Sequence, residues 1–120
     1  MPNDISSSGV GAYAIIRWRG EITPQAIEAS GLEAIERAAA EDIRRILVDV
    51  SAITNRLGAT DLFLTTEAHS RLGPPRPRTA LLGRPDQAED LRFIEDVGVN
   101  RGMPLKAFTA KEDALNWLLT

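Results

Sequence analysis

The residues best suited to chemistry follow a short apolar strand near the middle of the chain. Residues 46–50 are apolar except for Asp49, and Ser51 and Thr54 come soon after. Ligand and partner sites of α/β folds lie at such carboxyl ends of strands, where side chains leave the sheet and helix N-termini point outward. A carboxylate there must be hydrated, paired or capped. Its plainer role is to accept N–H bonds from the following turn, and we prefer that role, which is compatible with binding.

A second group of polar residues extends this edge toward the next helix and into a later loop. Asn55, Gly58 and Thr60 complete the polar turn, while Arg76 and Arg78 belong to a proline-rich loop. Arginine offers a planar, bidentate donor to anions, although a solvated loop explains these two residues with fewer assumptions. The predicted partner or ligand contacts are therefore Asp49, Ser51, Thr54, Asn55, Gly58, Thr60, Arg76 and Arg78.

Other catalytic and metal-binding chemistry finds little support in the sequence. His69 is the single histidine and there is no cysteine, so we predict no metal site and no cofactor. We expect His69 to be a surface residue near a helix C-terminus. No G-x-S-x-G segment is present, and the run from Gly9 to Ala14 precedes a strand where a dinucleotide fingerprint would follow one. We therefore predict a protein that is not an enzyme. The remaining enzymatic alternative would need four acid–base residues to meet: Asp49, Asp61, Glu67 and His69.

Length and charge restrict the class of protein. With 120 residues and a net charge of −3, the chain fits one domain without a dominant basic surface, which argues against nucleic acid as a partner. No apolar run reaches the roughly 18–20 residues of a spanning helix, although peripheral membrane or lipid contact stays open. The N-terminus lacks a signal-peptide pattern, and the absence of cysteine suits a reducing compartment, so we expect a cytoplasmic protein.

Strands and helices should alternate along the chain. We expect strands at 13–18, 46–50, 79–82 and 105–108, with a short antiparallel return at Glu21–Ile22. Thr23 and Pro24 should start the first helix, and Ala59 or Thr60 should cap a second that runs to about Arg71. Asp86 with Glu89 and Thr109 with Glu112 have capping-box spacing for the third and fourth helices, and Gly102 should end the third.

This order predicts an α/β fold. It is a single-domain, mostly parallel sheet of about four to five strands with an antiparallel edge, and four helices. We expect residues 1–10 to be a flexible N-terminal segment and residues 11–120 to form the domain. An exposed edge strand at Tyr13–Trp18 would allow a homodimer.

Several segments, in this order, resemble the STAS superfamily, which includes anti-sigma-factor antagonists, and above all its small stand-alone SpoIIAA-like proteins. The matching segments are Leu47–Ser51, Gly58–Leu62, Leu91–Glu95, Asn100–Gly102, Phe108–Thr109, Glu112–Leu115 and Trp117–Leu118. The resemblance implies helices largely on one side of the sheet and a partner-binding edge after Asp49. In phosphorylatable antagonists a serine lies in an Asp-Ser-Ser-Gly-like turn there, whereas this chain has Leu57-Gly58-Ala59-Thr60, so Thr60 is the nearest hydroxyl for a phosphate.

These observations lead to two functional hypotheses. The first is a non-enzymatic protein-interaction or regulatory module that lacks the usual phosphoacceptor serine and binds a protein partner not yet identified. The alternative is a carrier of a small apolar or acidic ligand in a pocket between helices and sheet. Side chains that could line such a pocket are Leu62, Phe63, Phe93 and Trp117.

Overall fold

The structure is a computed structural model that describes residues 3–7, 13–71 and 76–120. Within these residues it has four α-helices, as predicted. The elements in chain order are β1 (Asn3–Ser7), β2 (Ala14–Gly20), α1 (Pro24–Ala40), β3 (Arg45–Ile53), α2 (Ala59–Ser70), β4 (Arg78–Leu82), a 3-10 turn η1 (Pro85–Gln87), α3 (Ala88–Asn100), β5 (Leu105–Phe108) and α4 (Lys111–Leu118).

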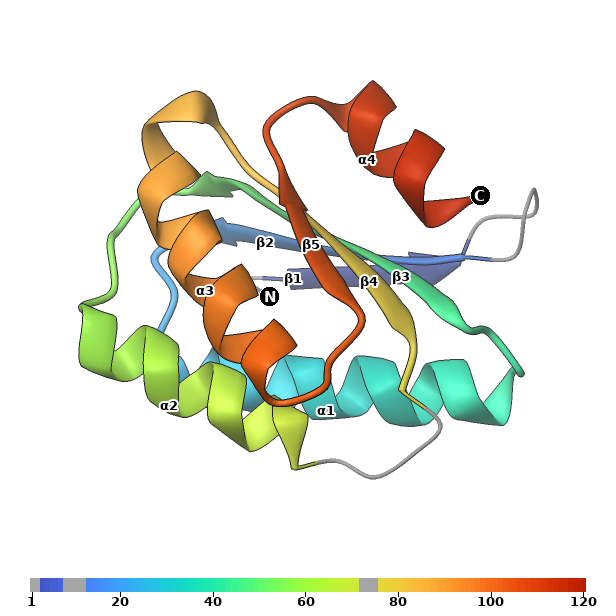
Figure 1. Cartoon of the computed structure of the whole chain (residues 1–120). Coiled ribbons are helices and arrows are strands. Elements are labelled where there is room, and N and C mark those ends of the chain that lie inside the picture. The colour runs from blue at the N-terminus through green and yellow to red at the C-terminus, as the bar shows by residue number, and fades with distance from the viewer. Residues whose placement is uncertain (1–2, 8–12, 72–75) are drawn as a thin grey trace.

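The strands form one sheet in the order β1-β2-β3-β4-β5 (Figure 1). Strands β2 to β5 are mutually parallel, as the alternation of strands and helices predicts. Strand β1 pairs antiparallel with β2, so Tyr13–Trp18 is not an edge segment, and the expectation of an exposed edge there is wrong. Glu21–Ile22 form a bend and a loop instead of a return strand. Whether residues 1–10 are flexible stays a prediction, since a strand assignment does not measure mobility.

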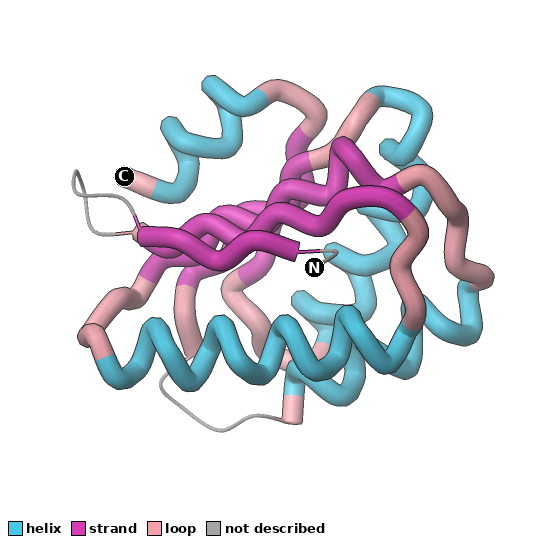
Figure 2. Tube along the Cα trace, turned by 180° about the vertical axis from the view of Figure 1, so that it is seen from behind, coloured by secondary structure: helices cyan, strands magenta, loops and turns pink. Residues whose placement is uncertain are grey.

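Two apolar clusters lie on opposite faces of the sheet. Ile46, Val48 and Val50 belong to the larger cluster, with α1 and α3, whereas Leu47 belongs to the smaller one with α4. This division follows from the two-residue period of a strand. Figure 2 shows α1 along one face and α4 on the other. Three of the four helices therefore share one side, in agreement with the implication of the resemblance.

Helix α2 occupies an outer position on the three-helix side. Within the described part of the chain it packs mainly against α1 and α3 and makes few direct contacts with the strands. Three of its four buried side chains are short: Thr65, Thr66 and Ser70. The hydroxyls of Thr65 and Thr66 donate hydrogen bonds to the carbonyls of Asp61 and Leu62 in the same helix. This arrangement leaves a hollow between α2 and the sheet.

The element ends show where local signals predict correctly. Thr23 caps α1 by accepting a hydrogen bond from the Ala26 amide at 3.1 Å, with Pro24 at the first helical position, as predicted. Strand β5 has the predicted bounds, and Gly102 adopts a φ of +81° after α3, a left-handed conformation that favours glycine.

Other predicted helix starts are wrong by one or two residues. Helix α2 begins after Gly58, so Thr60 lies inside the first turn and does not cap it. The N-cap of α4 is Ala110, one residue after Thr109. The third helix begins with the 3-10 turn, in which the Gln87 side chain accepts from the Arg84 amide at 2.7 Å, in place of the expected pairing of Asp86 with Glu89.

Candidate functional site

Asp49 lies inside β3, because this strand continues to Ile53 and not to the predicted Val50. Its carboxylate accepts hydrogen bonds from the Ser51 amide at 2.9 Å and the Ser51 hydroxyl at 2.6 Å, and it lies 3.8 Å from the Arg17 guanidinium. The carboxylate is thus bonded within its own strand and to a neighbour. We expected Asp49 to accept N–H bonds from a following turn; it does accept a backbone N–H bond, but from Ser51 within the strand.

The hydrogen bonds of Asp49 coincide with a bulge in β3. Arg17 of β2 pairs with Asp49, but Arg19 pairs with Ala52, so β3 has one extra residue between these pairs. As a result Val50 and Ile53 both belong to the cluster beneath α1 and α3, although they are an odd number of residues apart. The bulge directs Ile53 into the interior of the three-helix side.

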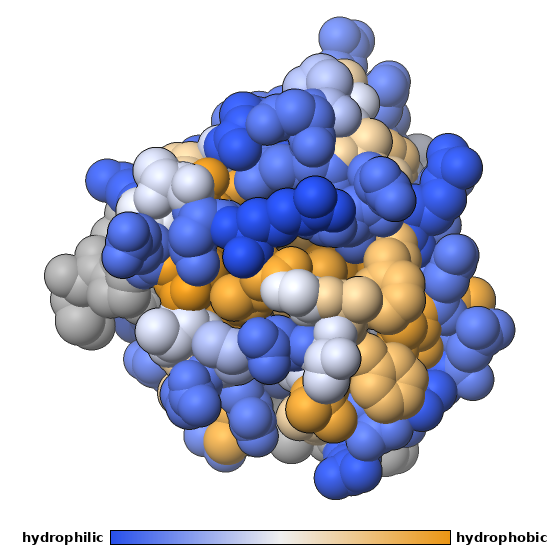
Figure 3. Space-filling view, turned by 90° about the vertical axis from the view of Figure 1, so that its left-hand side faces the viewer, coloured by the Kyte–Doolittle hydropathy of each residue, from blue (hydrophilic) through white to orange (hydrophobic). Residues whose placement is uncertain are grey.

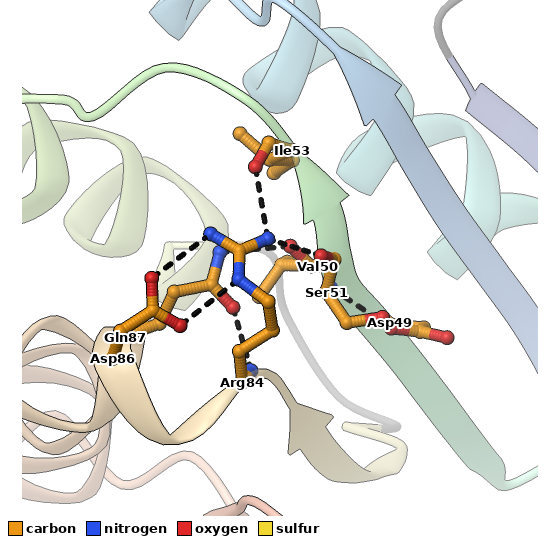
Figure 4. A network of polar contacts seen from close by, with 7 residues as sticks. All are labelled: Asp49, Val50, Ser51, Ile53, Arg84, Asp86 and Gln87. Atoms are coloured by element: carbon orange, nitrogen blue, oxygen red, sulfur yellow. Dashed lines mark hydrogen bonds and ion pairs between the residues drawn. The ribbon is translucent and has the colours of Figure 1, made fainter.

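The end of β3 is held by the turn that follows β4. Strand β4 ends opposite Asp49, at Leu82, and leaves the later β3 carbonyls on that side without a strand partner. Figure 4 shows the Arg84 guanidinium donating to the carbonyls of Ser51 and Ile53, the latter at 3.1 Å. Gln87 donates to the Val50 carbonyl at 3.0 Å.

Arg84 is also paired with a carboxylate in the same turn. Its Nε lies 2.9 Å from Asp86, and this hydrogen bond lowers the pKa of that carboxyl group. The sequence pattern did not identify Arg84 as part of this edge. Strand β3 is longer than β4, and its extra carbonyls need hydrogen-bond donors from elsewhere. A sequence pattern does not reveal this difference in length, so it could not indicate the role of Arg84.

The junction between β3 and α2, residues 54–60, is held to the rest of the protein by hydrogen bonds at Asn55, and several of its other residues are exposed. Asn55 accepts from the Ile22 amide at 2.7 Å and donates to the Ile22 carbonyl at 2.9 Å, which joins this junction to the loop before α1. Thr54, Gly58 and Thr60 are exposed. Gly58 is the N-cap residue of α2, and no side chain at the cap accepts a hydrogen bond from the first amides of that helix.

The predicted arginines lie at the other end of the sheet. Arg78 pairs with Arg45 at the start of the parallel strands, and its guanidinium stacks 4.0 Å from the Trp117 ring. Arg76 donates to the carbonyls of Ser70 and Arg101. The structure therefore does not bring these two residues together with the β3–α2 junction, because parallel strands separate their starts from their ends.

A cavity of about 340 Å³ lies between α2 and the sheet. Trp18, Val48 and Leu81 line it from the strands, and Leu91 and Ile94 line it from α3; from α2 the lining residues are Leu62, Thr65, Thr66 and His69. Of the four side chains predicted to line a pocket, Leu62 does so. Phe63 lies under Arg101 at 5.0 Å, Phe93 lines a neighbouring groove, and Trp117 packs on the opposite face with α4.

Two polar rings lie in the wall of this cavity. The indole Nε1 of Trp18 is buried and has no hydrogen-bond partner among the residues that the structure describes. The His69 Nε2 lies 3.3 Å from the Glu28 carbonyl, and burial lowers the pKa of the imidazole. His69 lies in the last turn of α2, as predicted, but its ring is half-buried against Gly31 of α1 and does not lie on the open surface.

An open groove of about 560 Å³ adjoins the cavity between the N-terminal parts of α2 and α3. Arg56, Leu57, Leu62 and Asp90 line both hollows. Arg56 lies between the two hollows, where its guanidinium donates two hydrogen bonds of 2.9 Å to the Asp90 carboxylate. Figure 3 shows this side of the molecule, with apolar surface exposed between hydrophilic side chains.

The four residues of the enzymatic alternative do not converge. Asp49 is two residues after Leu47 and so shares the sheet face on which Leu47 packs with α4, whereas His69 lines the cavity on the other side. Glu67 is paired with Arg71 and Arg101, and the hydrogen bond from Arg101 lowers the pKa of its carboxyl group. Within residues 3–7, 13–71 and 76–120 there is no cluster of three or more acidic or histidine side chains that could hold a metal ion. No helix in these ranges is long and apolar enough to span a membrane.

Comparison with known proteins identifies the fold. No protein-family model matches the sequence, and no curated protein does. The structure is similar to that of an anti-sigma factor antagonist from Mycobacterium paratuberculosis, with 20% identity, a TM-score of 0.62, and coverage of 98% of this chain and 93% of the other. It is also similar to an uncharacterised protein of the DUF3478 family with a SpoIIAA-like fold from Shewanella loihica, with 21% identity, a TM-score of 0.56, and coverage of 97% and 91%. At these identities the likeness establishes the fold: this chain has the SpoIIAA-like α/β fold that its sequence resemblance implies.

Proposed function

We propose that this protein is a regulatory protein-interaction module that binds its partner through the β3–α2 junction and the adjoining groove. The observation that carries this proposal is the exposed, uncapped start of α2 beside an open groove of about 560 Å³ with apolar residues in its wall. The junction itself is well supported from below by Asn55, Arg84 and Gln87. A rigid edge with an exposed polar tip and an apolar groove has the composition of a partner surface.

The fold comparison supports the same assignment. One similar structure is an anti-sigma factor antagonist, which is named for its action on a protein regulator. The resemblance in sequence implies a partner edge at the same junction. Thr60 is exposed in the first turn of α2, where a phosphate would face free backbone amides and the positive end of the helix dipole. We therefore propose Thr60 as the residue through which charge can alter partner binding.

Two substitutions on this surface test the proposal. The tagged protein would be expressed in its native host, purified with its partner and examined by native mass spectrometry. Leu57→Asp puts a charge into the groove and Thr60→Glu adds one at the helix start, so both should reduce the recovered complex by at least tenfold. Glu112→Gln on α4, which is exposed and lies on the other side of the sheet, should leave recovery unchanged. Equal recovery with all three variants would contradict this location.

The carrier of a small ligand is the second candidate function, and the cavity of about 340 Å³ favours it. Ligand pockets in proteins begin at roughly 300 Å³ and are mostly apolar with a few polar groups. Comparison of native and denaturing mass spectra of the protein, purified without detergent, tests this function. A bound small molecule that is released on unfolding would support a carrier, whereas a protein that neither retains nor takes up any apolar compound would contradict it.

A further inference from the structure

Two arginines lie side by side where the central strands begin, at the opposite end of the sheet from the β3–α2 junction. Arg45 of β3 and Arg78 of β4 are register partners. Side chains in register on neighbouring parallel strands leave the sheet on the same face, from positions about 4.8 Å apart. That face carries α4, because Arg45 is two residues before Leu47 and the Arg78 guanidinium lies 4.0 Å from the Trp117 ring. The two cations are therefore neighbours on one surface.

Neither arginine has a carboxylate partner among the residues that the structure describes. Arg45 forms no hydrogen bond or ion pair with any of them. Arg78 donates from Nη2 to the Trp117 carbonyl at 2.7 Å, an acceptor that carries no full charge. Asp49, the acidic residue of β3 on the same face, is paired with Arg17 instead. The positive charge of the pair is thus not compensated within these residues.

This arrangement is unfavourable without a counter-ion. Both side chains are half-buried, so each has lost part of the hydration that stabilises its charge. Like charges at neighbouring positions on adjacent strands also repel each other. An anion held between the two guanidinium groups would remove both costs.

Solvent can reach the donors that such an anion would need. The Nε of Arg78 is buried without a partner, whereas its Nη1 and the three guanidinium nitrogens of Arg45 are not among the buried, unpartnered side-chain atoms of the described residues. Since these four nitrogens also form no hydrogen bond with the described residues, they are available to a ligand from outside.

The available donors suit an oxyanion with two charges. A guanidinium group is a planar fork that matches the oxygens of phosphate or carboxylate. A phosphoryl group on a side chain carries about 1.5–2 negative charges near neutral pH and three acceptor oxygens, whereas a carboxylate carries one charge. The half-buried rings of Tyr13 and Trp117 belong to the apolar cluster on this face and offer contact to the rest of a phosphorylated molecule.

We propose that Arg45 and Arg78 form a binding site for a phosphoryl group, either as free phosphate or as part of a small phosphorylated molecule. Arg45 donates from its guanidinium, and Arg78 donates from Nη1 because its Nη2 is already bonded to Trp117. The site lies away from the proposed partner surface, so this inference does not rest on the proposed function.

Titration of the full chain with inorganic phosphate, phenyl phosphate and acetate tests the site, at constant ionic strength and about pH 8, where a phosphate monoester carries two charges. Proton–nitrogen spectra would follow the indole signals of Trp117, which contacts Arg78, and of Trp18, which lies on the other face. The Trp117→Phe variant assigns the two signals. We expect both phosphates to give saturable shifts at Trp117 alone, and acetate to bind about tenfold more weakly because it makes fewer charged hydrogen bonds.

The two phosphates distinguish the source of the group. Tighter binding of phenyl phosphate would support a phosphorylated molecule as the ligand, and equal binding would support the free ion. Shifts that rise with concentration without saturation, or acetate binding as tight as phosphate, would overturn the site.

Two variants separate this site from a general effect of charge. Arg45→Gln removes one cation and should weaken phosphate binding by about tenfold. Arg92→Gln is the matched control, because Arg92 is exposed on α3, on the other side of the sheet, and its loss should leave phosphate binding unchanged. Unchanged binding in Arg45→Gln, or an equal loss in both variants, would overturn the proposal.

Unfolding by urea provides a second readout. In phosphate-free buffer Arg45→Gln should be at least as stable as the native chain, because the repulsion between the two cations is relieved. Phosphate should then stabilise the native chain and Arg92→Gln, but not Arg45→Gln. A clear loss of stability of Arg45→Gln in phosphate-free buffer would contradict the uncompensated charge from which the site is inferred.

Discussion

The imidazole of His69 fits against α1 because residue 31 is a glycine. A Cβ at position 31 would overlap the His69 ring. The sequence shows one histidine late in a helix and one glycine inside another helix, and neither alone indicates contact. Their proximity depends on the packing of α1 against α2, which local patterns do not specify. This is why the sequence placed His69 at the surface.

The contact predicts a sign reversal in a double-mutant cycle. Gly31→Ala should destabilise the native protein by about 1–3 kcal/mol, because the added methyl group overlaps the ring. In a His69→Ala background the same change should stabilise by about 0.5–1 kcal/mol, since alanine is preferred to glycine within a helix. Urea unfolding of the four proteins measures both values. A destabilisation of equal size in both backgrounds would exclude the contact as its cause.

The lowered pKa of His69 predicts a loss of stability in mild acid. Burial is the main cause and favours the neutral ring, with the Glu28 carbonyl and charge acting in the opposite direction. Because the folded pKa lies below the ordinary value of 6.5, the unfolded chain binds a proton first as pH falls. The full contribution is therefore present above pH 6.5 and is lost as pH falls toward the folded pKa.

Free energies of unfolding measured between pH 5 and pH 8 check this prediction. The native protein should lose more stability than His69→Gln over this range, because the variant has no imidazole to titrate. Carboxylates elsewhere act on both proteins alike. Parallel curves for the two proteins would show that His69 titrates in the folded chain as it does in the unfolded one.

At the scale of elements, the carboxyl end of β3 differs most from the sequence-based prediction. Periodicity identified the strand and its buried face. It did not predict the bulge after Asp49, and it did not predict that the strand continues through residues 51–53. A bulge depends on the partner strand, and the carbonyls that β3 has beyond the end of β4 are satisfied by Arg84 and Gln87, more than thirty residues later. Such long-range satisfaction of backbone groups has no local signature.

Asn55 should be the most important side chain of the junction for stability. Asn55→Ala leaves the amide and carbonyl of Ile22 without their partner, and we expect a loss of about 1–3 kcal/mol. Thr54→Ala is a matched control, since its side chain is exposed, and it should change stability by less than about 0.5 kcal/mol. Thermal or urea unfolding of both variants gives the comparison. Equal effects at the two positions would contradict the bridging role of Asn55.

At the scale of the molecule, the sequence predicted the alternation of strands with four helices along the chain and the mostly parallel sheet, because alternating strands and helices permit few topologies. It joined the arginines of the later loop to the β3–α2 junction, whereas parallel strands place them at opposite ends. The alternative hypothesis included a pocket between helices and sheet; a cavity lies there, but most of its lining side chains differ from those named for that hypothesis. Which side chains line the cavity depends on the outer position of α2. That position results from the packing of three helices together, and the pattern of a single helix does not predict it.

The outer position of α2 has a consequence for motion. A helix that packs mainly on two other helices can separate from them while the strands keep their hydrogen bonds. Amide hydrogen exchange should therefore be faster in residues 63–70 than in residues 46–49 of β3. Uniform exchange across both segments would show that they open together. In this molecule the sheet would serve as the permanent frame, and α2 as the part that moves against it.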